Sequence, residues 1–211
     1  VRFLYYNRGN YMKIPDEVPK VSQKLSKKGY KSYLVGGCVR DLLIGVDPKD
    51  WDVATDALPE EIQKGFEDSV YENEFGTVGV KTNSKDETLK IIEVTTFRKE
   101  AGYSNKRHPD EVSFTKDIEE DLARRDFTIN AIAFDLIDKE DPIDPYGGQK
   151  DLTKGVIKAV GDPETRFKED ALRLMRAVRL AAEVGFEIED KTREASKSEA
   201  KSMKEIAAER M

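Results

Sequence analysis

Up to about residue 161, apolar positions alternate between strand-like and helix-like spacing. Val18, Val21 and Leu25 recur at intervals of three and four, which predicts an amphipathic helix over 15–29. Runs rich in β-branched residues predict strands at 30–35, 51–55, 77–82, 88–97, 131–136 and 156–160. Further helices are predicted at 39–44, 59–66 and 117–125. This order indicates a mixed α+β domain.

The pattern changes near Gly161. Beyond it, apolar side chains recur at helical spacing, at Leu172, Met175, Val178 and Ala182, and we predict no further strand. We therefore predict an α+β domain at 12–161 and the start of a helical domain at 162–211. So short a helical part has little to pack against, so we expect a longer parent protein. Residues 1–11 are treated as an extension or tag, outside the fold.

The segment 98–111 has no periodicity and is rich in charged residues, Gly, Asn and Pro, which predicts a mobile loop. Before it, the strands predicted at 77–82 and 88–97 are separated by a short polar stretch, which predicts a β-hairpin.

Composition narrows the protein class. Hydrophobic residues make up 38% and charged residues 37% of the chain, and we see neither a membrane span nor a signal peptide, so we expect a cytoplasmic protein. With Cys38 and His108 as the single cysteine and histidine, any metal must take oxygen ligands, which favours Mg²⁺ or Mn²⁺. The net charge of −6 argues mildly against nucleic-acid binding, although a local basic stripe can coexist with it.

The strongest candidate site begins where a predicted strand runs into Gly36 and Gly37. Glycines let the backbone approach a ligand, the following helix start suits a triphosphate, and Arg40 adds charge-assisted hydrogen bonds. On a strand, Asp50 and Asp52 would project from one face, where they could bridge two Mg²⁺ ions roughly 3.5–4 Å apart. Taken singly, a Gly-Gly pair or an Asp-x-Asp pair is more often an ordinary turn.

Three more groups of polar residues have two interpretations each. Glu93 is either a third metal-site carboxylate or an exposed strand residue. The group Arg124, Arg125, Asp126 and Asn130 suits phosphates and ribose hydroxyls, or forms a salt-bridged helix end. Asp170 and Arg173, three apart on a predicted helix, could present donors and acceptors to a nucleobase, or form an ordinary ion pair.

Together these blocks resemble the class II tRNA nucleotidyltransferase and bacterial poly(A) polymerase family, within the DNA polymerase β-like superfamily. The matching blocks, in the family's order, are 36–41, 50–52, 124–131, 144–148 and 169–177. The resemblance implies a head domain with a mixed sheet and flanking helices, then an all-α neck. Family members continue into further helical domains, so we expect this chain to carry the head and the start of the neck.

The resemblance also implies roles. Asp50 and Asp52 would be the metal-binding catalytic carboxylates, with Glu93 in support. The nucleotide-binding residues it implies are Gly36, Gly37, Arg40, Arg124, Arg125, Asp126, Asn130, Glu169, Asp170, Arg173 and Arg176. Asp170 and Arg173 would pair with the base edge of ATP or CTP, with Glu169 holding Arg173 in position.

The implied reaction adds CMP and AMP from CTP and ATP to the 3′ end of tRNA, with release of pyrophosphate. The segment 98–111 resembles the family's flexible loop, which is associated with the switch to ATP, and so disfavours an enzyme that adds only C. An A-adding enzyme, a bacterial poly(A) polymerase and a non-catalytic nucleotide- or RNA-binding fragment remain alternatives.

Overall fold

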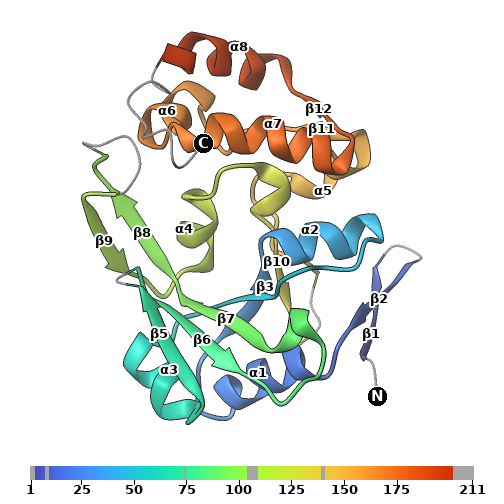
Figure 1. Ribbon diagram of the computed structural model, residues 1–211, viewed down its shortest axis with the longest axis vertical. Coiled ribbons are helices and arrows are strands. Elements are labelled where there is room, and N and C mark those ends of the chain that lie inside the picture. Colours follow the sequence, from blue (N-terminus) through green and yellow to red (C-terminus); the bar gives the residue numbers. More distant parts are fainter. Residues whose placement is uncertain (1–2, 8–9, 74, 104–108, 139–140, 202–211) are drawn as a thin grey trace.

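A six-stranded mixed sheet forms the centre of the computed structural model, which describes residues 3–7, 10–73, 75–103, 109–138 and 141–201 (Figure 1). The strands, in spatial order, are β10 (Ala133–Asp135), β3 (Ser32–Val35), β4 (Asp52–Thr55), β7 (Ile91–Thr96), β6 (Thr77–Lys81) and β5 (Ser69–Asn73). Neighbours run antiparallel except β4 and β7, which are parallel. The predicted mixed sheet is confirmed, and β5 is a strand that the sequence pattern did not reveal.

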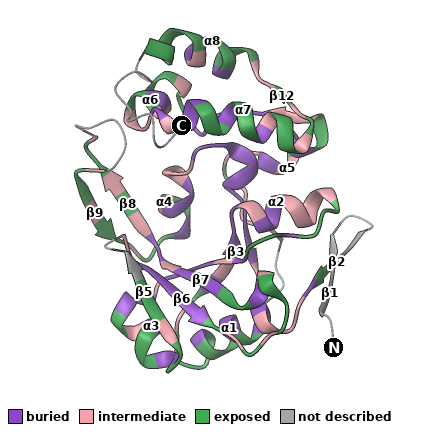
Figure 2. Ribbon diagram, in the orientation of Figure 1, coloured by how far each residue is buried: buried purple, intermediate pink, exposed green. Residues whose placement is uncertain are grey.

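Helices cover both faces of the sheet because its strands alternate their side chains. Val53 and Val94 face a core shared with Val18 of α1 (Glu17–Ser26) and Ile62 of α3 (Pro59–Gly65). On the other face, Ala54 packs in a second cluster with residues of α4 (Ile118–Ala123). Buried residues run from the sheet through α4 toward the upper helices (Figure 2). The two faces therefore differ: helices cover the apolar core of one face, and the other face carries polar residues beside its core.

The upper layer in Figure 1 is helical. It contains α6 (Pro163–Glu169), α7 (Leu172–Val184) and α8 (Asp190–Glu199). Below it lie α2 (Gly37–Ile44) and α5 (Gly148–Lys154), with short 3₁₀ turns η1 (Glu87–Leu89) and η2 (Thr128–Asn130) elsewhere in the chain. The helical character predicted beyond 161 is confirmed. No helix in the described ranges has the length and apolar character to cross a membrane.

Two-stranded sheets correct two expectations and include residues of the segment set aside as an extension, whose status stays a prediction. Residues set aside as an extension form a hairpin of β1 (Phe3–Asn7) with β2 (Asn10–Ile14). The ends of the segment predicted to be a loop pair as β8 (Arg98–Ala101) with β9 (Glu111–Phe114), while 104–108, including His108, lie outside the described residues. A strand does return after 161, since β12 (Glu187–Ile188) pairs in parallel with β11 (Val156–Ile157). That pairing crosses the predicted boundary near Gly161, which stays a prediction.

Candidate functional site

Three carboxylates line one cavity where β4 and β7 run side by side. Asp52 opens β4, and its register partner on β7 is Glu93. Because directly paired residues project from the same face of a sheet, both carboxylates face one side. Asp50 lies in a bend before β4, and the strand begins at Asp52 rather than at residue 51, so the expectation that Asp50 and Asp52 project from one face of a strand is wrong. All three nevertheless line one open cavity of about 590 Å³.

Gly36 brings the backbone against these carboxylates. It caps α2 with φ +76°, in the left-handed region where a side chain is strained. A Cβ placed there would lie 3.1 Å from Oδ2 of Asp52 and 3.2 Å from Nη1 of Arg125. Glycine is therefore required twice, by conformation and by space, while the predicted close approach of the backbone to a ligand stays a prediction.

Asp52 has a perturbed carboxyl group. Its pKa is raised to about 6, chiefly by burial, with the nearby charge of Asp50 acting in the same direction and Arg125 opposing both. Among the described residues, no three Asp, Glu, His or Cys side chains form a ligand cluster by themselves. Two carboxylates fit Mg²⁺, which usually binds one or two carboxylates and takes other ligands from water and substrate phosphates. The donor set thus suits a hard divalent cation at Asp50 and Asp52, while a role for Glu93 in binding metal stays a prediction.

A polar network connects α2 to α7. Nη1 of Arg40 donates to Oδ1 of Asn130 at 2.9 Å, and Nδ2 of Asn130 donates to Oδ1 of Asp126 at 3.2 Å. Oδ2 of Asp126 then accepts from Nε and Nη2 of Arg176 at 2.8 and 2.7 Å. Arg40 also pairs with Asp41 at 2.7 Å. The structure therefore brings the predicted residues of three separate sequence blocks into one chain of contacts.

The paired arginines share a buried acid. Asp121 accepts from Nη2 of Arg124 at 2.8 Å and from Nη2 of Arg125 at 3.1 Å, and its side chain is 1% exposed. Arg124 also reaches Glu100 at 3.1 Å. The salt-bridged interpretation of this block is thus correct for two of its members. It does not exclude ligand binding, because both arginines also line a second cavity of about 440 Å³.

The helix predicted to carry both Asp170 and Arg173 is broken between them. Asp170 caps the end of α6 and Ala171 precedes α7, so the two residues do not share a helix face. The guanidinium of Arg173 binds Oε2 of Glu169 at 2.6 Å, the contact that the family resemblance implies. Asp170 and Arg173 still line the second cavity together.

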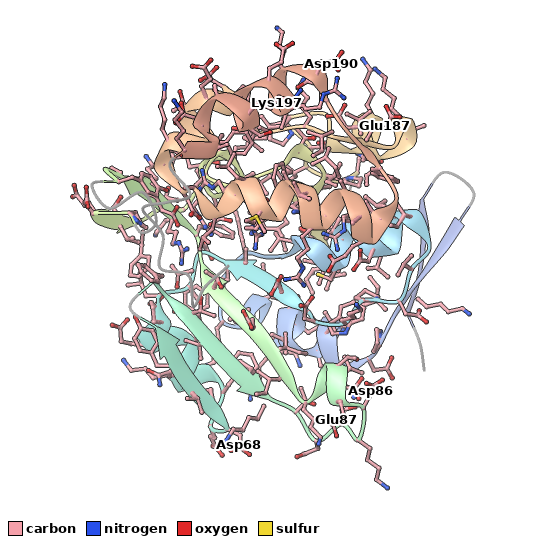
Figure 3. All side chains as sticks on the ribbon, turned by 45° about the horizontal axis from the view of Figure 1, so that its top comes forward. Asp68, Asp86, Glu87, Glu187, Asp190 and Lys197 are labelled. Carbon is pink, nitrogen blue, oxygen red and sulfur yellow. The ribbon has the colours of Figure 1, made fainter. Side chains whose placement is uncertain are left out.

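The two cavities adjoin. The larger contains the carboxylates, the smaller contains Asp170 and Arg173, and both are lined by Gly37, Asp52, Asp126, Asn130 and Arg176. A ligand could therefore extend from the carboxylates to Arg173 past one shared wall. The acidic residues labelled in Figure 3, at both far ends of the molecule, take no part in either cavity. Part of the negative net charge thus lies away from the site.

The sequence analysis missed several residues in these walls. Lys49 and Arg179 line the larger cavity, and Arg98, Glu100 and Tyr103 line the smaller. Arg98 and Glu100 are two apart, the spacing of one strand face, and this signal could have revealed β8. Cys38 is fully buried and burial raises the pKa of its thiol, as expected for a packed, unreactive side chain.

Comparisons with known proteins show which family this chain belongs to. Residues 32–158 match the family model described as the poly A polymerase head domain. The CCA-adding enzyme of Ligilactobacillus salivarius is 46% identical over 94% of this chain and 48% of its own length. That of a Geobacillus strain is 44% identical over 90% of this chain and 46% of its own length. The chain therefore spans about half the length of the curated relatives it matches.

Solved structures give the same result. The Bacillus stearothermophilus CCA-adding enzyme, in complex with CTP, superposes with a TM-score of 0.81 at 41% identity, covering 92% of this chain and 45% of that one. The Thermotoga maritima CCA-adding enzyme, complexed with tRNA, superposes with a TM-score of 0.71 at 26% identity, over 92% of this chain and 44% of that one. From its matched residues and its fold, this chain belongs to the poly(A) polymerase head-domain family of nucleotidyltransferases.

Proposed function

We propose that this chain contains the catalytic head and the beginning of the neck of an enzyme that adds CMP and AMP to the 3′ end of tRNA. One observation carries the proposal: the carboxylate cavity and the Arg173 cavity share a wall, so one nucleotide can occupy both. Its relatives named CCA-adding enzymes, at 44–46% identity, support the same activity.

The larger cavity suits a triphosphate. Four basic residues line this cavity together with Asp50 and Asp52: Lys49, Arg40, Arg176 and Arg179. Guanidinium groups bind phosphate oxygens through paired hydrogen bonds, and the start of α2 at Gly37 adds backbone N–H groups. A divalent cation held by Asp50 and Asp52 would neutralise charge on the reacting phosphates and activate the attacking hydroxyl.

The smaller cavity suits the base and ribose. Arg173 donates hydrogen bonds and Asp170 accepts them, so the pair can match the edge of cytosine or adenine. Asp126 and Asn130, in the shared wall, have the right chemistry for ribose hydroxyls. Such a site discriminates strongly against the wrong base, because that base leaves the hydrogen-bonding groups of the site without partners.

In the proposed reaction, the RNA 3′ oxygen forms a bond to the α-phosphorus of the nucleotide. The bond from that phosphorus to the bridging oxygen breaks, pyrophosphate leaves, and the hydroxyl proton is lost to solvent. The protein holds the two substrates in line and presents fixed positive charge to the phosphates, and no covalent enzyme intermediate is needed.

The test is extension of three tRNAs, ending before CCA, after C and after CC, with CTP and ATP offered separately and together. Addition of C to the first two and of A to the third supports the proposal. Addition of A alone to the third indicates an A-adding enzyme, and repeated A addition without C indicates a poly(A) polymerase.

The double variant Asp50→Ala/Asp52→Ala is the control and must release no pyrophosphate. If the unmodified chain binds CTP and ATP in the presence of Mg²⁺ but extends none of the three tRNAs, the catalytic proposal is wrong for this chain. It would then be a nucleotide-binding head that lacks activity by itself.

A further inference from the structure

Two arginines of the helical layer bind consecutive carbonyls at the end of α4. Nη1 of Arg166 donates to the carbonyl of Ala123 at 3.1 Å, and Nη2 of Arg173 donates to the carbonyl of Arg124 at 3.2 Å. The last carbonyls of a helix lack intrahelical partners and carry partial negative charge, so guanidinium groups satisfy them well. The two arginines thus tie α6 and α7 to the helix that precedes the paired Arg124 and Arg125.

Arg166 is also connected to Arg173 in two ways, through a shared carboxylate and through its own backbone carbonyl. Its Nη2 binds Oε1 of Glu169 at 2.8 Å, while Oε2 of the same carboxylate binds Nη1 of Arg173 at 2.6 Å. Its own backbone carbonyl accepts from Nη1 of Arg173 at 3.1 Å. Glu169 therefore lies between two guanidiniums, each of which is anchored to α4.

These side chains are well shielded from solvent. Exposed fractions are 19% for Arg166, 17% for Glu169 and 8% for Arg173. Neither cavity wall includes Arg166 or Glu169, although Arg173 lines the smaller cavity. Arg166 can therefore act on a nucleotide in that cavity only indirectly, through residues that it contacts or positions, such as Arg173.

We propose that Arg166 is a positioning residue for base selection, acting on Arg173 through Glu169; this rests on the proposed function. A free arginine side chain has several rotatable bonds, and a base edge is recognised only if the guanidinium is fixed. Glu169 alone leaves the carboxylate able to turn, whereas Arg166 attaches it to the C-terminal end of α4. The orientation of Arg173 toward a base is therefore set jointly by its own hydrogen bond to the carbonyl of Arg124 and by the contact between α6 and α4.

The test measures binding of CTP, ATP, UTP and inorganic tripolyphosphate with Mg²⁺ and without RNA. Arg166→Gln removes the anchor, and Arg166→Lys keeps the charge without the planar fork that reaches two acceptors. Lys168→Gln is the matched control, because Lys168 lies on the same helix with a side chain 58% exposed and distant ion pairs at 3.6 and 3.8 Å. Thermal unfolding of each variant is recorded in parallel.

We expect Arg166→Gln to weaken CTP and ATP binding by about 10- to 100-fold, toward the level of UTP, with tripolyphosphate binding unchanged. Arg166→Lys should restore part of the preference, and Lys168→Gln should match the unmodified chain. Equal loss of CTP and tripolyphosphate binding, or an unchanged preference for CTP over UTP in both Arg166 variants, would overturn the inference. If Arg166→Gln does not fold, the result for Arg166→Lys decides.

A different outcome concerns the proposed function itself. If the unmodified chain binds UTP as tightly as CTP and ATP, base selection does not take place at this site. The variants then have no preference to lose, and both the proposed base recognition and the role of Arg166 are rejected together. A preference that is present in the unmodified chain but unaffected at Arg166 rejects only the positioning role.

Discussion

Arg176 of α7 binds Asp126, 50 residues earlier in the chain, through both Nε and Nη2. The Asp126 side chain is 9% exposed, and its other oxygen accepts from Asn130 and from the N–H of Phe127. Burial alone would raise the pKa of Asp126, but the charge and hydrogen bonds of Arg176 outweigh it and hold that pKa low. The helical layer is thus joined to the sheet layer by a charged contact in the wall shared by both cavities.

Replacing Arg176 should therefore destabilise the protein. Arg176→Gln leaves Asp126 with its neutral donors only, and because the Arg176 side chain is itself 60% exposed we expect a loss of about 1 kcal/mol in the free energy of unfolding. Urea unfolding followed by circular dichroism measures it. Arg179→Gln, on the same helix with a side chain 77% exposed, should change stability by no more than about 0.5 kcal/mol. Equal losses in the two variants would contradict the proposed importance of the Asp126 contact.

Gly36→Ala should abolish activity because the added Cβ meets neighbouring side chains. A second glycine with a similar φ angle serves as the control for backbone strain. Gly36 and Gly29 have similar positive φ angles, +76° and +88°, but only Gly36 has neighbours within 4 Å of an added Cβ. Both alanine variants should lose about 1–2 kcal/mol of stability from backbone strain. Only Gly36→Ala should displace Asp52 and Arg125 and reduce pyrophosphate release by about 100-fold or more. A similar fall in activity for Gly29→Ala would show that strain alone is responsible.

Glu93→Gln tests whether the carboxylate paired with Asp52 assists the metal. If Glu93 contributes to the metal's environment, the variant should need a higher Mg²⁺ concentration for half-maximal pyrophosphate release, with its stability little changed. Glu87→Gln is the control, because Glu87 is 81% exposed and lies in the connection before the same strand. Glu93 is exposed on β7, so an unchanged Mg²⁺ requirement would leave it as an exposed strand residue without a role toward the metal, the second interpretation given from the sequence.

Asp121 should make the free energy of unfolding depend on pH in the acid range. Burial opposes its charged form, but the charges and hydrogen bonds of Arg124 and Arg125 outweigh this and lower its pKa in the folded protein. Its charged form thus stabilises the fold above the unfolded pKa of about 3.9, and this contribution is lost as pH falls through the lower folded value. The stability difference between the unmodified chain and Asp121→Asn should therefore shrink below about pH 4. Denaturant unfolding between pH 3 and pH 7 measures it, and a constant difference would refute the assignment.

Local patterns in the sequence were sufficient for much of the secondary structure. The spacing of Val18, Val21 and Leu25 predicted α1, and Gly185, with φ +70°, ends α7 where the pattern stops. The β8–β9 hairpin was missed because its residues are mostly polar. It is held by tertiary contacts instead: Arg98 donates its backbone N–H to Asp121 and a side-chain hydrogen bond to the carbonyl of Phe75.

The sequence by itself determined which residue types are available: two adjacent glycines, alternating aspartates and the arginine blocks, each in a short local motif. Only the tertiary structure decided how they meet. Asp52 lies beside Glu93 because β4 and β7 pair in parallel, and Asp170 is separated from its expected helix by a break before α7. Such contacts depend on packing between segments distant along the chain, where burial and hydrogen bonding outweigh local preference, so no local period encodes them.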